Sequence, residues 1–289
     1  MAYYRHPRAA PIDPPRCNLL AFAPPARGAR RSTLVQQLQG TSLESRVARL
    51  QELQKEAPAD IIERFEKSLE MSWVYHDSAL EGVVYNKEEL HQAIIVQEPP
   101  SDSSALPAYD EIRNHLNAVA LVYELTQKKR LNISLDVIKK IYARLAPEEL
   151  EGKAQPTYRK DMPLHRLYFH EIAPPEKISY RMRQLVQWMN ATETKRSTHA
   201  VRLAAKAHHQ LLHIYPFPRQ SGKVARLIMN LILLRQGYPP VVIHATQRQR
   251  YYDALKTSDD AVARLITEAL GATVESTINY FAGGDEEEE

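Results

Sequence analysis

One segment of the chain, residues 215–226, constrains the fold and the chemistry more than any other. It reads Tyr-Pro-Phe-Pro-Arg-Gln-Ser-Gly-Lys-Val-Ala-Arg and leads from a stiff, proline-containing loop into a helix. Apolar residues then recur at three- and four-residue spacing as far as Arg235, and a glycine followed by two prolines ends the pattern. Backbone N–H groups at such a helix N-terminus can bind an anion. The segment therefore predicts a phosphate-binding loop, with added positive charge from Arg219, Lys223 and Arg226.

Two small residues are expected to shape the start of this helix. Ser221 belongs to the residue types that cap helix N-termini with a side-chain oxygen. Gly222 has no Cβ, so the backbone there can come close to a ligand.

The rest of the chain is patterned mainly for helices. A β-hairpin is expected only near 156–173, where aromatic and branched residues occur without a helical period. Helix starts are indicated by Asn86 with Glu89, by Ser134 and by Ser258. The expected helices span 44–56, 60–80, 87–96, 108–128, 134–146, 175–191, 196–213, 222–236, 247–257 and 259–281.

Both ends of the chain differ in composition from the centre. Residues 1–41 contain six prolines and no sustained period, and are expected to form a disordered Pro/Arg-rich tail. Residues 283–289 are expected to form an acidic tail. The residues between, 42–282, are predicted to make one mainly α domain.

Charge and cysteine content limit the classes of function. The first 41 residues carry six arginines and one aspartate, a balance of +5, which leaves −2 for the remainder of a chain whose net charge is +3. Nucleic-acid binding by a basic face is therefore not expected of the predicted domain. Cys17 is the only cysteine, which favours a cytoplasmic location, and no apolar run approaches the roughly 20 residues that would cross a membrane.

The order of several further segments resembles the Fic (Fido-fold) family of AMP-transferring proteins, from about residue 60 to residue 281. The family loop reads HPFx[DE]GNGRxxR, and YPFPRQSGKVAR stands at the same place here. Residues 156–190 resemble the family's substrate-docking flap and the helix after it, and Tyr251 and Tyr252 lie in a segment that resembles the helix enclosing the adenine. The resemblance implies a helical Fic-type domain with a small β-hairpin flap.

The groups that carry the family's chemistry are replaced in this chain. The resemblance implies that a histidine takes the proton from the target hydroxyl, whereas Tyr215 stands there with an ordinary pKa of about 10. It also implies a carboxylate that holds Mg²⁺, whereas Arg219 has the wrong charge for a metal and could instead neutralise phosphate. Gln220 and Ser221 alter the phosphate cradle, and Lys223 keeps a charge without the bidentate geometry of arginine.

A regulatory element is implied as well. Residues 72–82 resemble the family's inhibitory helix, [ST]xxxE[GN], in which a glutamate pairs with the last arginine of the loop. Glu81 and Arg226 would be that pair here, and Asp77 replaces the serine or threonine of the motif.

These observations favour a degenerate Fic-like protein that binds a nucleotide or phosphorylated ligand, or acts as a regulatory module, without metal-dependent AMP transfer. The alternative is a Fic-fold transferase with metal-independent chemistry, moving a nucleotidyl, phosphoryl or glycosyl group to a protein hydroxyl. In that case Tyr215 would act as base or nucleophile, and His209 and His213 lie on the preceding helix. The residues expected to contact the nucleotide are Arg219, Ser221, Gly222, Lys223, Arg226, Tyr251 and Tyr252.

Cofactor and partner expectations follow from the same residues. No metal site is expected, and ATP or another nucleotide would bind without Mg²⁺. A protein target would dock at the 156–173 flap, and the family resemblance makes a homodimer a further expectation. Nucleic acid and membranes are not expected partners.

Overall fold

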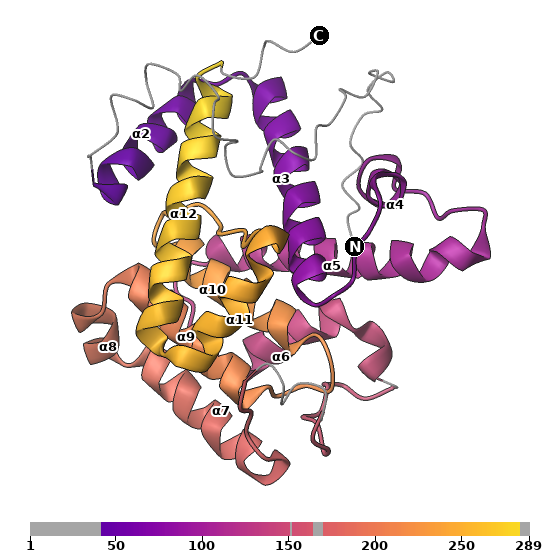
Figure 1. Cartoon of the computed structure of the whole chain (residues 1–289), viewed down its shortest axis with the longest axis vertical. Coiled ribbons are helices and arrows are strands. Elements are labelled where there is room, and N and C mark those ends of the chain that lie inside the picture. Colours follow the sequence, from indigo (N-terminus) through magenta and orange to yellow (C-terminus); the bar gives the residue numbers. More distant parts are fainter. Residues whose placement is uncertain (1–41, 151, 164–169, 284–289) are drawn as a thin grey trace.

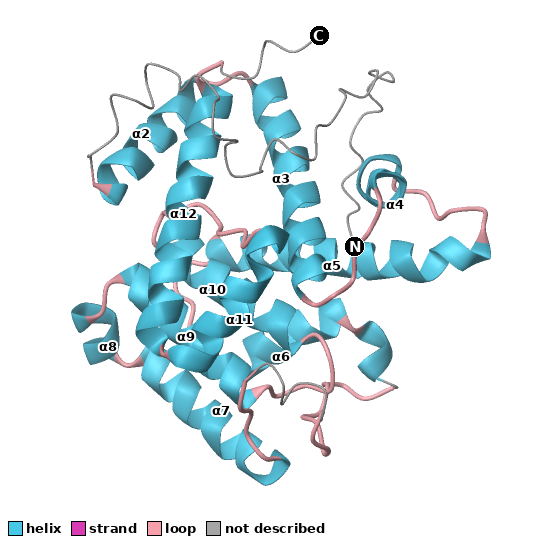
Figure 2. Ribbon diagram, viewed as in Figure 1, coloured by secondary structure: helices cyan, strands magenta, loops and turns pink. Residues whose placement is uncertain are grey.

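The computed structural model describes residues 42–150, 152–163 and 170–283. Helices make up most of these residues, and no strand occurs among them (Figure 2). The mainly α fold class is therefore confirmed. The α-helices are α2 (Leu43–Glu56), α3 (Ala59–Leu80), α4 (Lys87–His91), α5 (Leu106–Thr126), α6 (Leu135–Leu145), α7 (Pro175–Asn190), α8 (Thr192–Ser197), α9 (Ala200–Ile214), α10 (Ser221–Arg235), α11 (Arg248–Thr257) and α12 (Asp259–Phe281).

Helix α10 is the centre of the molecule (Figure 1). Every residue from Ser221 to Leu233 is buried, as expected of a helix that neighbours cover on all sides. It packs most extensively against α9, and α5 and α6 also pack on it. Helices α7 and α12 cover α9, and α12 also packs along α2. The loop between α9 and α10 therefore joins the two helices that pack most extensively against each other.

The predicted helix starts are present as side-chain caps. Asn86 and Glu89 form a reciprocal capping box at α4. Ser134 accepts a hydrogen bond from the backbone of Val137, and Ser258 accepts one from the backbone of Ala261. These caps satisfy N–H groups that would otherwise lack partners in the first helical turn.

Two predicted helices are divided. The span 87–96 consists of α4 followed by a π-helix, Gln92–Val96, which ends at Gln97 in the left-handed region. The span 196–213 is broken at residues 198–199, where α8 ends and α9 begins. Neither break is marked by a glycine or a proline, so the periodic sequence pattern did not reveal them.

The predicted β-hairpin at 156–173 is not seen in the described part of that segment. Residues 156–163 and 170–173 contain no strand, and residues 164–169 lie outside the described residues. Backbone hydrogen bonds of this segment go instead to the neighbouring loop: the Arg159 N–H donates to the carbonyl of Pro216 over 2.9 Å, and the Ala173 N–H donates to that of His213 over 2.8 Å. The predicted tails, 1–41 and nearly all of 283–289, also lie outside the described residues, so the domain boundaries stay predictions.

Candidate functional site

The loop between α9 and α10 turns through two residues with positive φ. Tyr215 ends α9 at φ 48°, and Gln220 precedes α10 at φ 60°. Neither is a glycine, although the left-handed region disfavours residues with a Cβ. Backbone strain of this kind persists where the surrounding structure imposes it, and it is common at functional sites.

The serine of the loop does not cap α10 as predicted. Residue Gln220 occupies the N-cap position and makes no side-chain cap bond. The Ser221 hydroxyl instead accepts from the N–H of Phe217 over 2.9 Å and donates to the carbonyl of the same residue over 3.1 Å. It therefore closes the loop on itself, and the Phe217 ring stacks on Tyr142 with centroids 3.9 Å apart.

Tyr215 is packed into the main hydrophobic core, with 1% of its surface exposed. Its backbone carbonyl accepts from Nε of Arg159 over 2.7 Å. Another guanidinium nitrogen of Arg159 donates to the carbonyl of Ile214, at the C-terminus of α9. The ring at the predicted catalytic position thus belongs to the core, and the sequence did not single out the role of Arg159 in fixing it.

Arg219 is largely exposed and has carboxylate partners within this chain. Its side chain is 52% exposed and forms ion pairs with Glu148 and Glu149, the latter over 3.2 Å. These glutamates belong to the 3-10 helix Pro147–Leu150, about 70 residues earlier in the chain. Two carboxylates of the chain therefore pair with the Arg219 guanidinium at the exposed rim of the loop, and its predicted contact with a nucleotide stays a prediction. Nothing in the local sequence of the loop indicated these partners.

Lys223 is buried on α10, and its ammonium has a carboxylate partner. Its Nζ lies 2.9 Å from Oε1 of Glu111, on α5. The same oxygen accepts from Nε2 of Gln220 over 3.1 Å. Burial acts to raise the pKa of Glu111, but the Lys223 charge and these hydrogen bonds bring it below its ordinary value. The sequence did not identify Glu111, because it lies 112 residues from Lys223.

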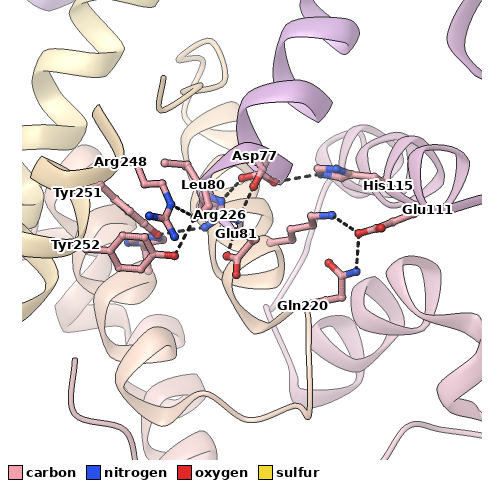
Figure 3. Close-up of polar contacts among 12 residues, drawn as sticks. Asp77, Leu80, Glu81, Glu111, His115, Gln220, Arg226, Arg248, Tyr251 and Tyr252 are labelled. Atoms are coloured by element: carbon pink, nitrogen blue, oxygen red, sulfur yellow. Dashed lines mark hydrogen bonds and ion pairs between the residues drawn. The ribbon is translucent and has the colours of Figure 1, made fainter. Parts of the chain in front are cut away.

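Arg226 is almost completely buried, with 2% of its surface exposed (Figure 3). One terminal nitrogen lies 3.0 Å from Oε1 of Glu81, and the guanidinium also contacts the carboxylate of Asp77. The Tyr251 hydroxyl accepts from its other terminal nitrogen over 3.3 Å. Burial acts to lower the pKa of Arg226, but Asp77, with Tyr251 and Glu81, raises it well above its ordinary value. The predicted contact between Glu81 and Arg226 is thus present in the geometry.

The carboxylate of Glu81 lies directly against the first turn of α10. A Cβ at position 222 would stand only 1.8 Å from its Oε1, so this approach requires the glycine. The Glu81 side chain therefore lies where the helix N-terminus would attract an external anion. Glu81 is also the C-cap residue of α3, and the next residue, Gly82, has φ 94°.

The two tyrosines of α11 hold the end of α3 and the loop arginine. Tyr252 donates from its hydroxyl to the carbonyl of Leu80 over 3.0 Å, and Nε of Arg248 donates to the same carbonyl. The Tyr251 hydroxyl lies 3.0 Å from Nε2 of His208. Burial, together with the Arg226 charge, lowers the pKa of His208 well below its ordinary value. Both tyrosines were predicted to enclose a nucleotide, and both are buried with their hydroxyls engaged within the protein.

The two histidines proposed as lying near Tyr215, His209 and His213, contact each other. Their Nε2 atoms lie 2.9 Å apart, and both contact the carbonyl of Leu255. His209 also pairs through Nδ1 with Asp259. Among the described residues, no group of three or more histidine, cysteine, aspartate or glutamate side chains is arranged to hold a metal ion.

Comparison with known proteins agrees with this architecture. Residues 132–233 match the model of the Fic/DOC family. Over 222 residues the chain is 28% identical to the protein adenylyltransferase Fic of Culex quinquefasciatus and 27% identical to that of Aedes aegypti; these alignments cover 76% of this chain and 43% of each relative. The chain thus spans less than half the length of these curated relatives.

Solved structures share the fold. A Fic domain-containing signalling protein from Bacteroides thetaiotaomicron aligns with a TM-score of 0.71 at 20% identity, covering 86% of this chain and 99% of that one. Fic-1 of C. elegans aligns with a TM-score of 0.66 at 24% identity, covering 87% and 74%. No helix in the described ranges combines the length and apolar content that crossing a membrane requires. Residues 132–233 thus match the Fic/DOC family, and the described part of the chain shares the fold of solved Fic-domain proteins.

Proposed function

We propose that this protein is a Fic-fold binding or regulatory module that does not carry out metal-dependent AMP transfer. In this proposal the α10 N-terminus is an anion site that the chain itself occupies through Glu81. The observation that carries it is the position of that carboxylate, against Gly222 and 3.0 Å from Arg226.

The chemistry of the loop supports the first part of the proposal. A positioned general base contributes roughly 10²–10⁴ in rate, and the residue at that position is a buried phenol, Tyr215. The loop does not fit a Mg²⁺ ion either. Arg219 stands in place of the carboxylate. The Glu111 carboxylate, which contacts the side chains of Lys223 and Gln220, is already paired with an ammonium.

The charges of the loop support the second part. All three loop cations are paired with carboxylates of this chain: Arg219 at the rim, Lys223 through α5 and Arg226 through α3. An incoming nucleotide or phosphorylated ligand would have to displace Glu81 to reach the helix N-terminus. The affinity for such a ligand then depends on how readily the Glu81 side chain leaves the site. In this proposal Glu81 therefore regulates ligand binding.

Two measurements on the same variants test the proposal. Calorimetry with ATP and ADP, with and without Mg²⁺, should show at least about tenfold tighter nucleotide binding by Glu81→Gly than by the unaltered protein, because an anion no longer competes for the site. Metal should not strengthen this binding. Glu98→Gly, which removes an exposed loop carboxylate elsewhere, is the matched control and should bind like the unaltered protein.

Labelled ATP incubated with cell lysate tests transfer directly. Neither the unaltered protein nor Glu81→Gly should label a protein in the presence of Mg²⁺. Label that depends on Mg²⁺ would overturn the proposal. Metal-independent label that disappears in Tyr215→Phe would instead establish the altered transferase. A protein target at 156–173, a homodimer and a cytoplasmic location stay predictions that these assays do not address.

A further inference from the structure

Arg226 has a second anionic partner that is even more enclosed than Glu81. Asp77 lies one helical turn earlier on α3 and is 4% exposed. Its carboxylate contacts Nε of Arg226, and its backbone carbonyl accepts from a terminal nitrogen of the same guanidinium over 3.2 Å. The aspartate therefore binds the arginine through both its side chain and its main chain.

Most donors of the guanidinium are committed within the protein. An arginine has five N–H groups. Nε donates to the Asp77 carboxylate, one terminal nitrogen donates to the Asp77 carbonyl and to Glu81, and the other donates to the Tyr251 hydroxyl. If the Glu81 side chain moved away, Arg226 would lose only one of these four hydrogen bonds. It would stay ion-paired with Asp77.

The position of Asp77 is fixed from its other side by α5. Its Oδ2 lies 3.1 Å from Nε2 of His115, which is equally buried (Figure 3). Burial acts to raise the pKa of Asp77, but the Arg226 charge and His115 bring it below its ordinary value, so the carboxylate is ionised at neutral pH. Helices α3, α5 and α10 all contribute to this group of side chains, so it does not depend on the orientation of the Glu81 side chain.

We infer that Asp77 is a permanent counter-ion of Arg226 that limits how strongly the opened site binds polyphosphates. With Glu81 displaced, the ligand meets an arginine–aspartate pair in place of a free cation, and the attraction for highly charged ligands is correspondingly weaker. The site then discriminates weakly between nucleoside mono- and triphosphates. This inference rests on the proposed function, because it concerns the regulation of the same anion site.

Four proteins test the inference: the unaltered chain, Glu81→Gly, Asp77→Ser and the double variant. Calorimetry measures their affinities for AMP, ADP and ATP without metal. We expect the double variant to bind ATP at least about tenfold tighter than Glu81→Gly does, with a much smaller gain for AMP. Asp136→Ser, on an exposed helix start, is the control for replacing an aspartate and should not change the affinities in the Glu81→Gly background.

The possible failures are distinguishable. If Glu81→Gly binds ATP and the double variant binds it no more tightly, Asp77 is only structural and the inference is wrong. If neither variant binds nucleotide, the proposed anion site itself is wrong. Asp77→Asn keeps the size of the side chain and provides a second neutral variant should the serine variant not fold. Inorganic triphosphate should raise the Tm of the double variant Glu81→Gly, Asp77→Asn by more than it raises the Tm of Glu81→Gly alone.

Discussion

Individual residues of the loop keep a backbone geometry that their side chains disfavour. Gln220 has φ 60° and ψ 6°, in the left-handed region where glycine is preferred. Its side chain donates to Glu111 over 3.1 Å, which partly offsets the strain. The packing of the turn between α9 and α10 thus preserves its backbone shape, although the position holds glutamine and not glycine.

Substitutions at Gln220 measure this strain. Gln220→Gly and Gln220→Ala both remove the hydrogen bond to Glu111, but only alanine keeps a Cβ at positive φ. The glycine variant should therefore be more stable than the alanine variant by about 1 kcal/mol. Chemical denaturation of both proteins provides the comparison. Equal stability, or greater stability of the alanine variant, would show that the turn is not strained.

Contacts between single residues show most clearly what the sequence can and cannot indicate. Glu81 and Arg226 were expected to meet, and they lie 3.0 Å apart. Arg219 was expected at the phosphates but is paired with Glu148 and Glu149. The first pair has a recognisable motif at each end, whereas the partners of Arg219 carry no motif and become neighbours only in the folded chain.

At the scale of whole elements, an ion pair ties α5 to the start of α10. The Lys223 side chain is 2% exposed, its partner Glu111 is 31% exposed, and this carboxylate neutralises the buried ammonium. A buried charge without a partner is unfavourable by several kcal/mol. The ion pair therefore stabilises the packing of α5 on α10, and it also holds Lys223 in place at the start of α10.

Glu111→Gln should lower the free energy of unfolding by about 1–3 kcal/mol, because the Lys223 ammonium loses its charged partner while staying buried. Glu124→Gln is a control on the same helix, since its exposed pair with Lys128 spans 3.9 Å and should contribute less than about 0.5 kcal/mol. Adding Lys223→Met to Glu111→Gln should restore part of the loss. Urea denaturation checks all three expectations, and an unchanged Glu111→Gln protein would contradict them.

Helix positions were predictable because apolar periodicity and caps are local signals. The predicted span 259–281 coincides with α12, and the capping serine before it is the residue expected. The boundary between α8 and α9 and the π-turn after α4 were missed. Propensity alone permits one continuous helix at both places, so packing must select the break.

Across the whole molecule, burial holds several histidines in the neutral form. The pKa of each is lowered, mainly by loss of contact with water, and that of His76 falls to about 3. The group comprises His76, His115, His208, His213 and His244. They lie on α3, α5, α9 and the segment before α11, so the effect concerns the entire fold.

The free energy of unfolding should consequently fall as the pH drops below about 6.5. Below that pH these histidines bind protons in the unfolded chain, whereas in the folded protein they do so only near their lowered pKa values. Each such histidine therefore lowers the free energy of unfolding by up to about 1.4 kcal/mol for each pH unit. Denaturation between pH 7 and pH 5.5 tests this, since carboxylates remain ionised in that range. His76→Gln should reduce the dependence, because the pKa of His76 is lowered to about 3 in the folded protein. Constant stability over this range would contradict the expectation.

The sequence by itself determined the helical character of the chain, most helix limits, and the identity of the loop that leads into α10, whose first turns carry the glycine, the lysine and the arginine. It did so because period, caps and motifs are written in neighbouring residues. Only the tertiary structure decided which carboxylate faces each loop cation, and that Arg219 is at the rim. Glu111 and Asp77 lie 112 and 149 residues from their cationic partners. Such pairing results from the packing of α3 and α5 against α10, and no local pattern specifies it.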